Sequence, residues 1–195
     1  MARTSTGNKR ERILDAAVVE IARRGYGATT VAMIARRAGV ADGTIYLYFK
    51  NKDEILVQLF ERAMGRFIDE GRERLEGLQG AVARLRAIVE LHLSLVGRDR
   101  DLAIITLGEL RHSLHFREER SRAQVGEYRA VIAQFVAEGR REGVFRADVD
   151  ALFAATAIFG VLDEMATDWI LSRRNTRLES RAPEVADFLL RGLRM

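Results

Sequence analysis

The chain has 195 residues, one proline, no cysteine and a formal net charge of +4, from 32 Lys and Arg against 28 Asp and Glu. The lack of cysteine excludes disulfide frameworks, thiolate metal sites and cysteine nucleophiles. We find no run of about 18 apolar residues and no apolar segment behind the basic N-terminus. The sequence therefore predicts a soluble, cytoplasmic protein with no membrane span and no signal peptide.

The positive charge is concentrated at the start of the chain. Residues 1–50 have a net charge of +5, whereas residues 51–195 have a net charge of −1. The three lysines, Lys9, Lys50 and Lys52, all lie in or just beside this first quarter. A basic segment attached to a near-neutral body favours nucleic-acid binding, although an acidic membrane surface would attract it in the same way.

The composition favours an all-α fold, because proline is almost absent and Ala, Leu, Arg and Glu are abundant. Apolar residues recur at helical spacing from residue 8 to 24, and a short second helix follows over 31–38, capped by Thr29 or Thr30. A third short helix is predicted over 43–47. Two short helices joined by a brief turn and packed on a longer helix form a helix-turn-helix.

A long connecting helix is predicted next, because Asn51 and Glu54 have the spacing of a capping box. This helix should end among three glycines, Gly71, Gly77 and Gly80. We therefore expect two domains, a helix-turn-helix head over residues 1–52 and a helical bundle over residues 53–195.

The bundle should contain several more helices, punctuated by glycines and loops. They are predicted over residues 81–96, 101–115, 122–142, 149–173 and 182–193, with Asp148 or Asp150 as the cap of the fourth and Pro183 in the first turn of the last. The stretch 151–162 (ALFAATAIFGVL) has no charged residue. A helix that is apolar on all sides must be buried on all sides, within a bundle or against a second subunit, so a homodimer is expected.

The stretch ADGTIYLYFKNK, residues 41–52, has the residue types of a DNA-reading segment. Gly43 and Thr44 are small enough to let a helix enter the major groove. The hydroxyl groups of Thr44, Tyr46 and Tyr48 can donate to phosphate oxygens, and lysine side chains neutralise phosphates. Ile45 and Phe49 within this stretch are expected in the core.

Residues 25–52 (GYGATTVAMIARRAGVADGTIYLYFKNK) closely resemble the DNA-binding head of the TetR family of transcriptional repressors. The resemblance implies a homodimer that binds double-stranded operator DNA, has a helical body for a small-molecule effector and dimerisation, and is not an enzyme. Ala41 replaces a common capping serine, so the cap is expected at Asp42, which either accepts from a cytosine amino group or disfavours other bases. The predicted DNA-contacting residues are Thr30, Asp42, Gly43, Thr44, Tyr46, Tyr48, Lys50 and Lys52.

The body also resembles one group within that family. The stretches LAIITLGELRHS (102–113) and IFGVLDEMATDWIL (158–171) are similar to the acyl-CoA-responsive, FadR-type repressors of fatty-acid degradation. The implied effector is a long-chain acyl-CoA, and no other cofactor is expected. An aromatic or cationic drug that controls efflux is the alternative effector, and an acyl-binding carrier or enzyme with a vestigial head is the alternative from another class.

An acyl-CoA needs an apolar tunnel for its tail and guanidinium groups for its phosphates. Arg111 lies in an apolar stretch and either marks the tunnel mouth or pairs with Asp163 or Glu164. For each aromatic residue of the body, the sequence favours plain core over a ligand wall. No metal site is expected, because His112 and His115 lack further ligands nearby in the sequence. The predicted ligand-binding residues are Arg111, His115, Phe116, Phe159 and Trp169.

Overall fold

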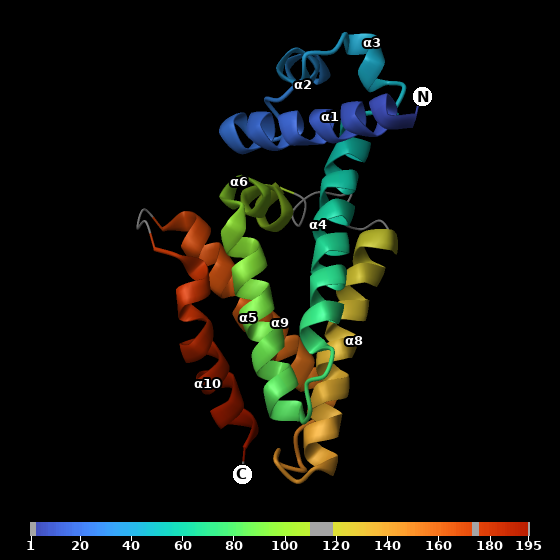
Figure 1. Ribbon diagram of the computed structural model, residues 1–195. Helices are drawn as coiled ribbons and strands as arrows, with labels where there is room; N and C mark the ends of the chain where they lie inside the picture. The colour runs from blue at the N-terminus through green and yellow to red at the C-terminus, as the bar shows by residue number, and fades with distance from the viewer. Residues whose placement is uncertain (1–2, 110–118, 173–175, 195) are drawn as a thin grey trace. The chain divides into compact units, whose positions relative to one another are not determined.

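The computed structural model describes residues 3–109, 119–172 and 176–194, and within these ranges the chain is helical with no strand (Figure 1). This confirms the predicted all-α class. The chain forms two compact units. The head unit contains residues 1–63 and 101–121, and the body unit contains residues 64–100 and 122–195.

The head unit is built on α1 (Arg3–Arg24), which packs against α2 (Val31–Ala38). Helix α3 (Asp42–Ile45) packs on α2, and the chain then enters the long helix α4 (Lys52–Leu75). The largest fully buried side chains of the unit come from all four helices and include Ile13, Ile21, Ile34, Ile45 and Leu56. Each such side chain contributes about 1.5–3 kcal/mol when it leaves water.

The polar residues at the helix ends explain where α2 and α4 begin and stop. The hydroxyl oxygen of Thr30 accepts a hydrogen bond from the Met33 N–H, so Thr30 is the cap of α2. Gly39 ends α2 with a φ of 64°, which an L-residue rarely adopts. Half of the predicted capping box is present, since Asn51 Oδ1 accepts from the Glu54 N–H at 2.8 Å. The Glu54 carboxylate, however, accepts from the Lys50 N–H at 2.6 Å.

Helix α3 begins and ends earlier than the helix that the sequence predicted over residues 43–47. Ala41 is the N-cap of α3 and provides no side-chain hydrogen bond, while Asp42 is already in the first turn. The expected shift of the cap to Asp42 is therefore wrong, because the Ala41 carbonyl already accepts the Thr44 N–H at 2.8 Å. The helix was predicted to reach Leu47, but the N–H groups of Leu47 and Tyr48 bond three residues back, which tightens the chain and ends α3.

In the body unit, α5 (Ala81–Arg98) packs against three elements. These are α9 (Ala151–Leu171), the 3₁₀-helix η3 (Leu178–Arg181) and α10 (Ala182–Leu193) (Figure 1). Helix α8 (Glu119–Arg141) is joined to α5 by Arg84, whose guanidinium binds both carboxylate oxygens of Glu138 at 2.7 and 2.8 Å. Both contacts are made by Arg84 Nη1, and this ion pair links α5 to α8.

Two features that the sequence predicted at helix starts in the body unit are confirmed. The carboxylate of Asp150 accepts from the Phe153 N–H at 2.7 Å, so α9 begins at Ala151 and not at residue 149. Pro183 lies in the first turn of α10.

The helix predicted over 101–115 is different in the structure. It is described only as the short α6 (Arg100–Ala103) followed by a π-helical turn, η1 (Ile104–Glu109), and the remainder lies outside the described residues. The Thr106 hydroxyl donates to the Leu102 carbonyl at 3.0 Å and so competes with the backbone at this turn.

The charge-free stretch of α9 is buried on one side only. Ala155, Ile158 and Leu162 lie in the core, whereas Leu152 and Phe153 are 68% and 72% exposed. The sequence analysis predicted that this helix is buried either within a bundle or against a second subunit. Within the described residues, the bundle of the chain itself buries only one side of α9.

Gly139 in α8 tests how tightly the body unit is packed. A Cβ there would lie 2.1 Å from Cδ2 of Phe145, a ring that is itself fully buried. We expect Gly139→Ala to lower the free energy of unfolding by about 1–3 kcal/mol through overpacking, measured by urea unfolding.

The matched control is Gly126→Ala in the same helix, where nothing lies within 4 Å of the added Cβ. There the gain in helix propensity should stabilise the chain by about 0.5–1 kcal/mol. Equal effects at the two positions would contradict the packing at Phe145.

Candidate functional site

The segment that begins at α3 presents most of the residues predicted to contact DNA. Asp42, Gly43, Tyr46 and Lys50 are exposed. Thr44, Tyr48 and Lys52 are partly buried. Ile45 and Phe49 are buried, as predicted, and fix the segment to the core of the head unit. The segment therefore exposes Gly43 and Tyr46, while its buried apolar residues hold it in place.

Thr30 combines the role of a cap with an exposed position. Its side-chain oxygen accepts from the Met33 N–H at 3.3 Å, and the side chain faces solvent. The hydroxyl hydrogen and the first backbone N–H groups of α2 are the donors that a phosphate group requires at a helix N-terminus.

Lys52 has a structural role that the sequence did not predict. Its ammonium group donates to the carbonyl oxygens of Tyr26 and Thr29 at 2.7 and 2.8 Å, and it lies 4.1 Å from the centroid of the Tyr26 ring. The Tyr26 hydroxyl donates to the carboxylate of Asp53. Burial and this carboxylate raise the pKa of Tyr26, which keeps the hydroxyl protonated as a donor. The first two residues of α4 therefore hold the turn between α1 and α2.

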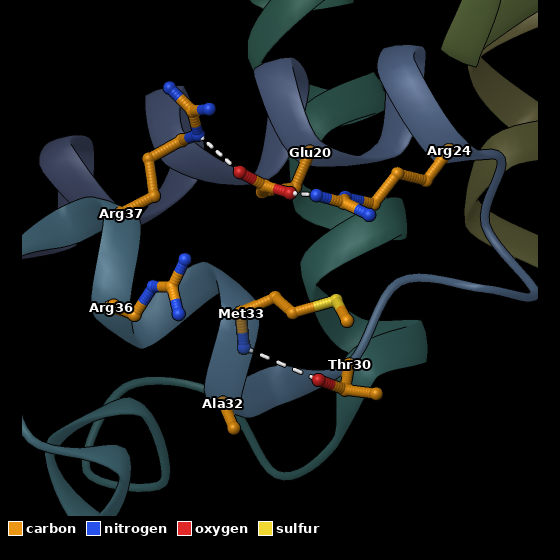
Figure 2. A pocket seen from close by; sticks show the side chains of 7 residues that line it. All are labelled: Glu20, Arg24, Thr30, Ala32, Met33, Arg36 and Arg37. Carbon is orange, nitrogen blue, oxygen red and sulfur yellow. Dashed lines mark hydrogen bonds and ion pairs between the residues drawn. The ribbon is translucent and has the colours of Figure 1, made fainter.

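A groove beside Thr30 is lined by residues that the sequence analysis did not single out. We call it the arginine groove; it has a volume of about 520 Å³ and is lined by Glu20, Arg24, Thr30, Ala32, Met33, Arg36 and Arg37 (Figure 2). Glu20 lies between two arginines, with Oε2 3.0 Å from Arg24 Nε and Oε1 2.5 Å from Arg37 Nε. The hydrogen bond from Arg37 holds the pKa of the Glu20 carboxyl below its usual range.

One sequence signal for this groove existed. Glu20 follows Ala17 by three residues and so falls on the apolar face of the first helix, among side chains that are buried. A carboxylate on such a face requires a cationic partner. The partners from α2 could not be inferred without the fold.

The body unit contains a cavity of about 270 Å³ among α4, α5 and α8. Its wall is mainly apolar, with four side chains that carry polar atoms. The lining residues are Met64, Phe67, Ile68, Gly71, Arg72, Leu75, Ile88, Gln124, Glu127, Tyr128 and Val131. Gln124 Oε1 is buried and has no hydrogen-bond partner within the described parts of the chain. An apolar wall with a few polar groups is the usual character of a small-molecule site.

An aromatic cluster lies against this cavity and includes two of its lining residues. The Tyr128 ring lies 4.6 Å from Phe67 and 5.7 Å from Phe159, centroid to centroid. The Tyr128 hydroxyl and His92 Nδ1 are 3.2 Å apart and share a hydrogen bond. Burial raises the pKa of Tyr128, so its hydroxyl stays protonated beside the imidazole.

Only two of the five predicted ligand-binding residues, Phe159 and Trp169, lie in the described parts of the chain. Phe159 belongs to the aromatic cluster. Trp169 does not line the cavity, since its indole N–H donates to the Thr176 carbonyl at 2.7 Å and its ring packs under the Arg100 guanidinium. Arg111, His115 and Phe116 lie outside the described residues, as does His112. None of the cavity-lining residues was predicted, because those on α4 were assigned to the connector and its core.

Residues 3–109, 119–172 and 176–194 contain no group of three or more His, Cys, Asp or Glu side chains arranged to hold a metal ion. In the same ranges no helix has the length and apolar character needed to cross a membrane.

Known families match nearly the whole chain in two consecutive parts. Residues 13–59 match the family described as "Bacterial regulatory proteins, tetR family", and residues 60–192 match "YsiA-like protein, C-terminal region". The chain is 38% identical over 182 residues to the "Fatty acid metabolism regulator protein" of Bacillus subtilis (strain 168), which covers 93% of each chain.

Two solved structures are similar along the same length. The fatty acid degradation regulator FadR from Bacillus halodurans has a TM-score of 0.88 and 38% identity, covering 95% of this chain and 96% of that one. FadR from Bacillus subtilis in complex with stearoyl-CoA has a TM-score of 0.86 and 37% identity, covering 94% and 98%. With the helix-turn-helix head and the helical body described above, these matches place the chain in the TetR family of bacterial regulatory proteins.

Proposed function

We propose that the protein is a homodimeric transcriptional repressor that binds a palindromic operator and is released by a long-chain acyl-CoA, so that it controls fatty-acid degradation genes. The observation that carries this proposal is the 38% identity to a fatty acid metabolism regulator over 93% of both chains. The similar B. subtilis FadR was solved with stearoyl-CoA, which supports an acyl-CoA as the effector.

On DNA, the exposed residues from Asp42 to Lys50 enter the major groove, and Thr30 binds a phosphate at the start of α2. Tyr46, which is 58% exposed, and Thr44 provide hydroxyl donors. Two heads related by a twofold axis would contact two half-sites separated by about one turn of DNA. In this arrangement Lys52 both holds the α1–α2 turn and carries its charge next to the DNA backbone.

The exposed apolar residues of the body unit support the dimer. Leu152 and Phe153 on α9 and Phe188 on α10 are each about 70% exposed. Large apolar side chains at this exposure mark protein–protein interfaces when several belong to one surface. A symmetric pair of such surfaces would bury them.

The proposed effector site is the 270 Å³ cavity, in which the acyl chain contacts α4, α5 and α8. Helix α4 provides six of the lining residues, and its first residues hold the turn that leads to Thr30. A ligand that displaces the cavity part of α4 therefore acts on the helix that positions the head. To release DNA it must favour the DNA-free form by a coupling free energy of about 1–3 kcal/mol.

A gel-shift assay on the chain's own promoter region tests the proposal directly. A discrete complex should form with the promoter duplex, and palmitoyl-CoA or stearoyl-CoA should dissociate it while free CoA and a cationic dye should not. Failure to prefer the promoter over a scrambled duplex, or an equal response to the dye, would overturn the operator or the effector assignment respectively.

Replacing Thr44 by Val removes the hydroxyl with little change in shape. The operator affinity should fall about fivefold, since one hydrogen bond contributes about 1 kcal/mol. Fluorescence anisotropy of a labelled duplex measures this loss, and the affinity for acyl-CoA should stay unchanged. A matched loss of both affinities would contradict the separation of the two sites.

Filling the cavity should impair the response to the effector. Val131→Phe places a ring in the cavity wall, and the acyl-CoA concentration for half-release from DNA should rise about tenfold, equivalent to about 1.4 kcal/mol. Val144→Phe, at an exposed position that does not line the cavity, is the control. Operator affinity without ligand should be the same for both variants and the parent chain.

The dimer can be tested by adding charge to the exposed face of α9. Phe153→Glu should convert the dimer to a folded monomer in sedimentation equilibrium, because two carboxylates would face each other in an apolar interface. Val144→Glu adds the same charge to the same unit and should remain a dimer. A dimeric Phe153→Glu variant would place the interface elsewhere.

A further inference from the structure

The arginine groove holds two guanidinium groups in fixed orientations around one carboxylate. Glu20 has a side chain only 8% exposed, whereas the side chains of Arg24 and Arg37 are 44% and 35% exposed. Both arginines contact Glu20 through Nε. These contacts do not use the terminal nitrogens of either guanidinium, which remain as a forked pair of donors on each side chain.

A purely stabilising role explains this arrangement poorly. Ion pairs with arginines that are more than a third exposed contribute little to folding, and burying a carboxylate has a cost. An arginine that is already held in one rotamer, in contrast, loses less conformational entropy when it binds a phosphate. The geometry thus favours recognition over stability.

The groove combines these arginines with residues on the outward face of α2. Figure 2 shows Arg24 and Arg37 on either side of Glu20, with Arg36, Met33 and Thr30 along α2. Three arginines against one carboxylate leave a net charge of +2 around an open groove of about 520 Å³. The phosphate backbone of DNA is the polyanion that the head is proposed to meet.

We propose that the arginine groove is a second phosphate-binding surface of the head, on which Arg24, Arg36 and Arg37 contact the backbone of double-stranded DNA, and that Glu20 is the positioning residue that orients Arg24 and Arg37. This inference rests on the proposed function, because it extends the contact with DNA from the α3 segment to α1 and α2. The contacts are independent of sequence, since only phosphates are bound.

The salt dependence of the affinity for DNA measures how many phosphate groups the protein contacts. Affinity is determined by fluorescence anisotropy on the promoter duplex and on a scrambled duplex at several salt concentrations. Arg24→Ala, Arg36→Ala and Arg37→Ala should each lower the slope of log affinity against log salt by about 0.9 on both duplexes. Arg23→Ala removes the neighbouring charge of α1, which does not line the groove, and should leave the slope unchanged.

The Glu20→Gln variant distinguishes two roles of the Glu20 carboxylate, which are to position the arginines or simply to repel DNA by its charge. If Glu20 were only a negative charge near DNA, its removal would strengthen binding. As the positioning residue, its loss should weaken binding about three- to tenfold, because two arginine side chains must then be ordered on DNA. Asp15→Asn removes an exposed carboxylate of the same helix and should not weaken binding. Arg37→Lys should keep the salt slope and still lower the affinity, since lysine lacks the fork.

The outcomes are distinguishable. Unchanged slopes for all three alanine variants, or a Glu20→Gln variant that is folded by circular dichroism and binds as tightly as the parent, would overturn the inference. If Glu20→Gln does not fold, the slopes of the alanine variants decide. If the parent chain binds neither duplex, the proposed function itself fails.

Discussion

The hydrogen bonds from Lys52 to the Tyr26 and Thr29 carbonyls are the constraint on which the rest of the head depends. They satisfy carbonyl groups in the turn after α1, and they do so from the first residue of α4. Thr29 adds its own hydroxyl, which donates to the Glu20 and Gly25 carbonyls at 3.1 and 2.9 Å. The turn that leads to Thr30 is therefore fixed from both sides, and α2 starts at a defined place and angle.

Because Lys52 is the first residue of α4, these hydrogen bonds give this long helix two roles. Its start belongs to the polar framework of the head, and its later turns form much of the cavity wall in the body. A helix is stiff along its axis because each residue is bonded to the next turn. Under the proposed function, a ligand in the cavity would therefore act on the first turn of α4 through the helix itself.

The fold was largely predictable from the sequence, and the sites only in part. Glycine stops, an Asn–Glu capping box and helical spacing are local signals, so α2, the start of α4 and the cap at Asp150 were found. The end of α3 was missed because it depends on how the chain turns to reach Asn51. Buried Ile45 and Phe49 were found from their apolar character.

The arginine groove and the cavity could not be predicted because each joins residues far apart in the sequence. Arg37 and Glu20 are 17 positions apart on different helices, and their pairing depends on the packing of α1 on α2. The cavity needs three helices, and most of its lining residues have the apolar character of ordinary core. Lys52 was predicted as a DNA contact from its charge and from the resemblance to the TetR head, and neither indicated its carbonyl partners.

The size of the cavity has a consequence for which ligands act as effectors. At about 270 Å³ it is slightly smaller than the usual range of small-molecule sites, about 300–1,000 Å³. Under the proposed function, a long acyl chain would enter by separating the surrounding helices, so part of its binding free energy would be spent on moving them. A compound short enough to fit the cavity as it stands would spend nothing on that movement and would leave the DNA-bound form undisturbed. Such a compound would occupy the site silently and act as an antagonist of the effector.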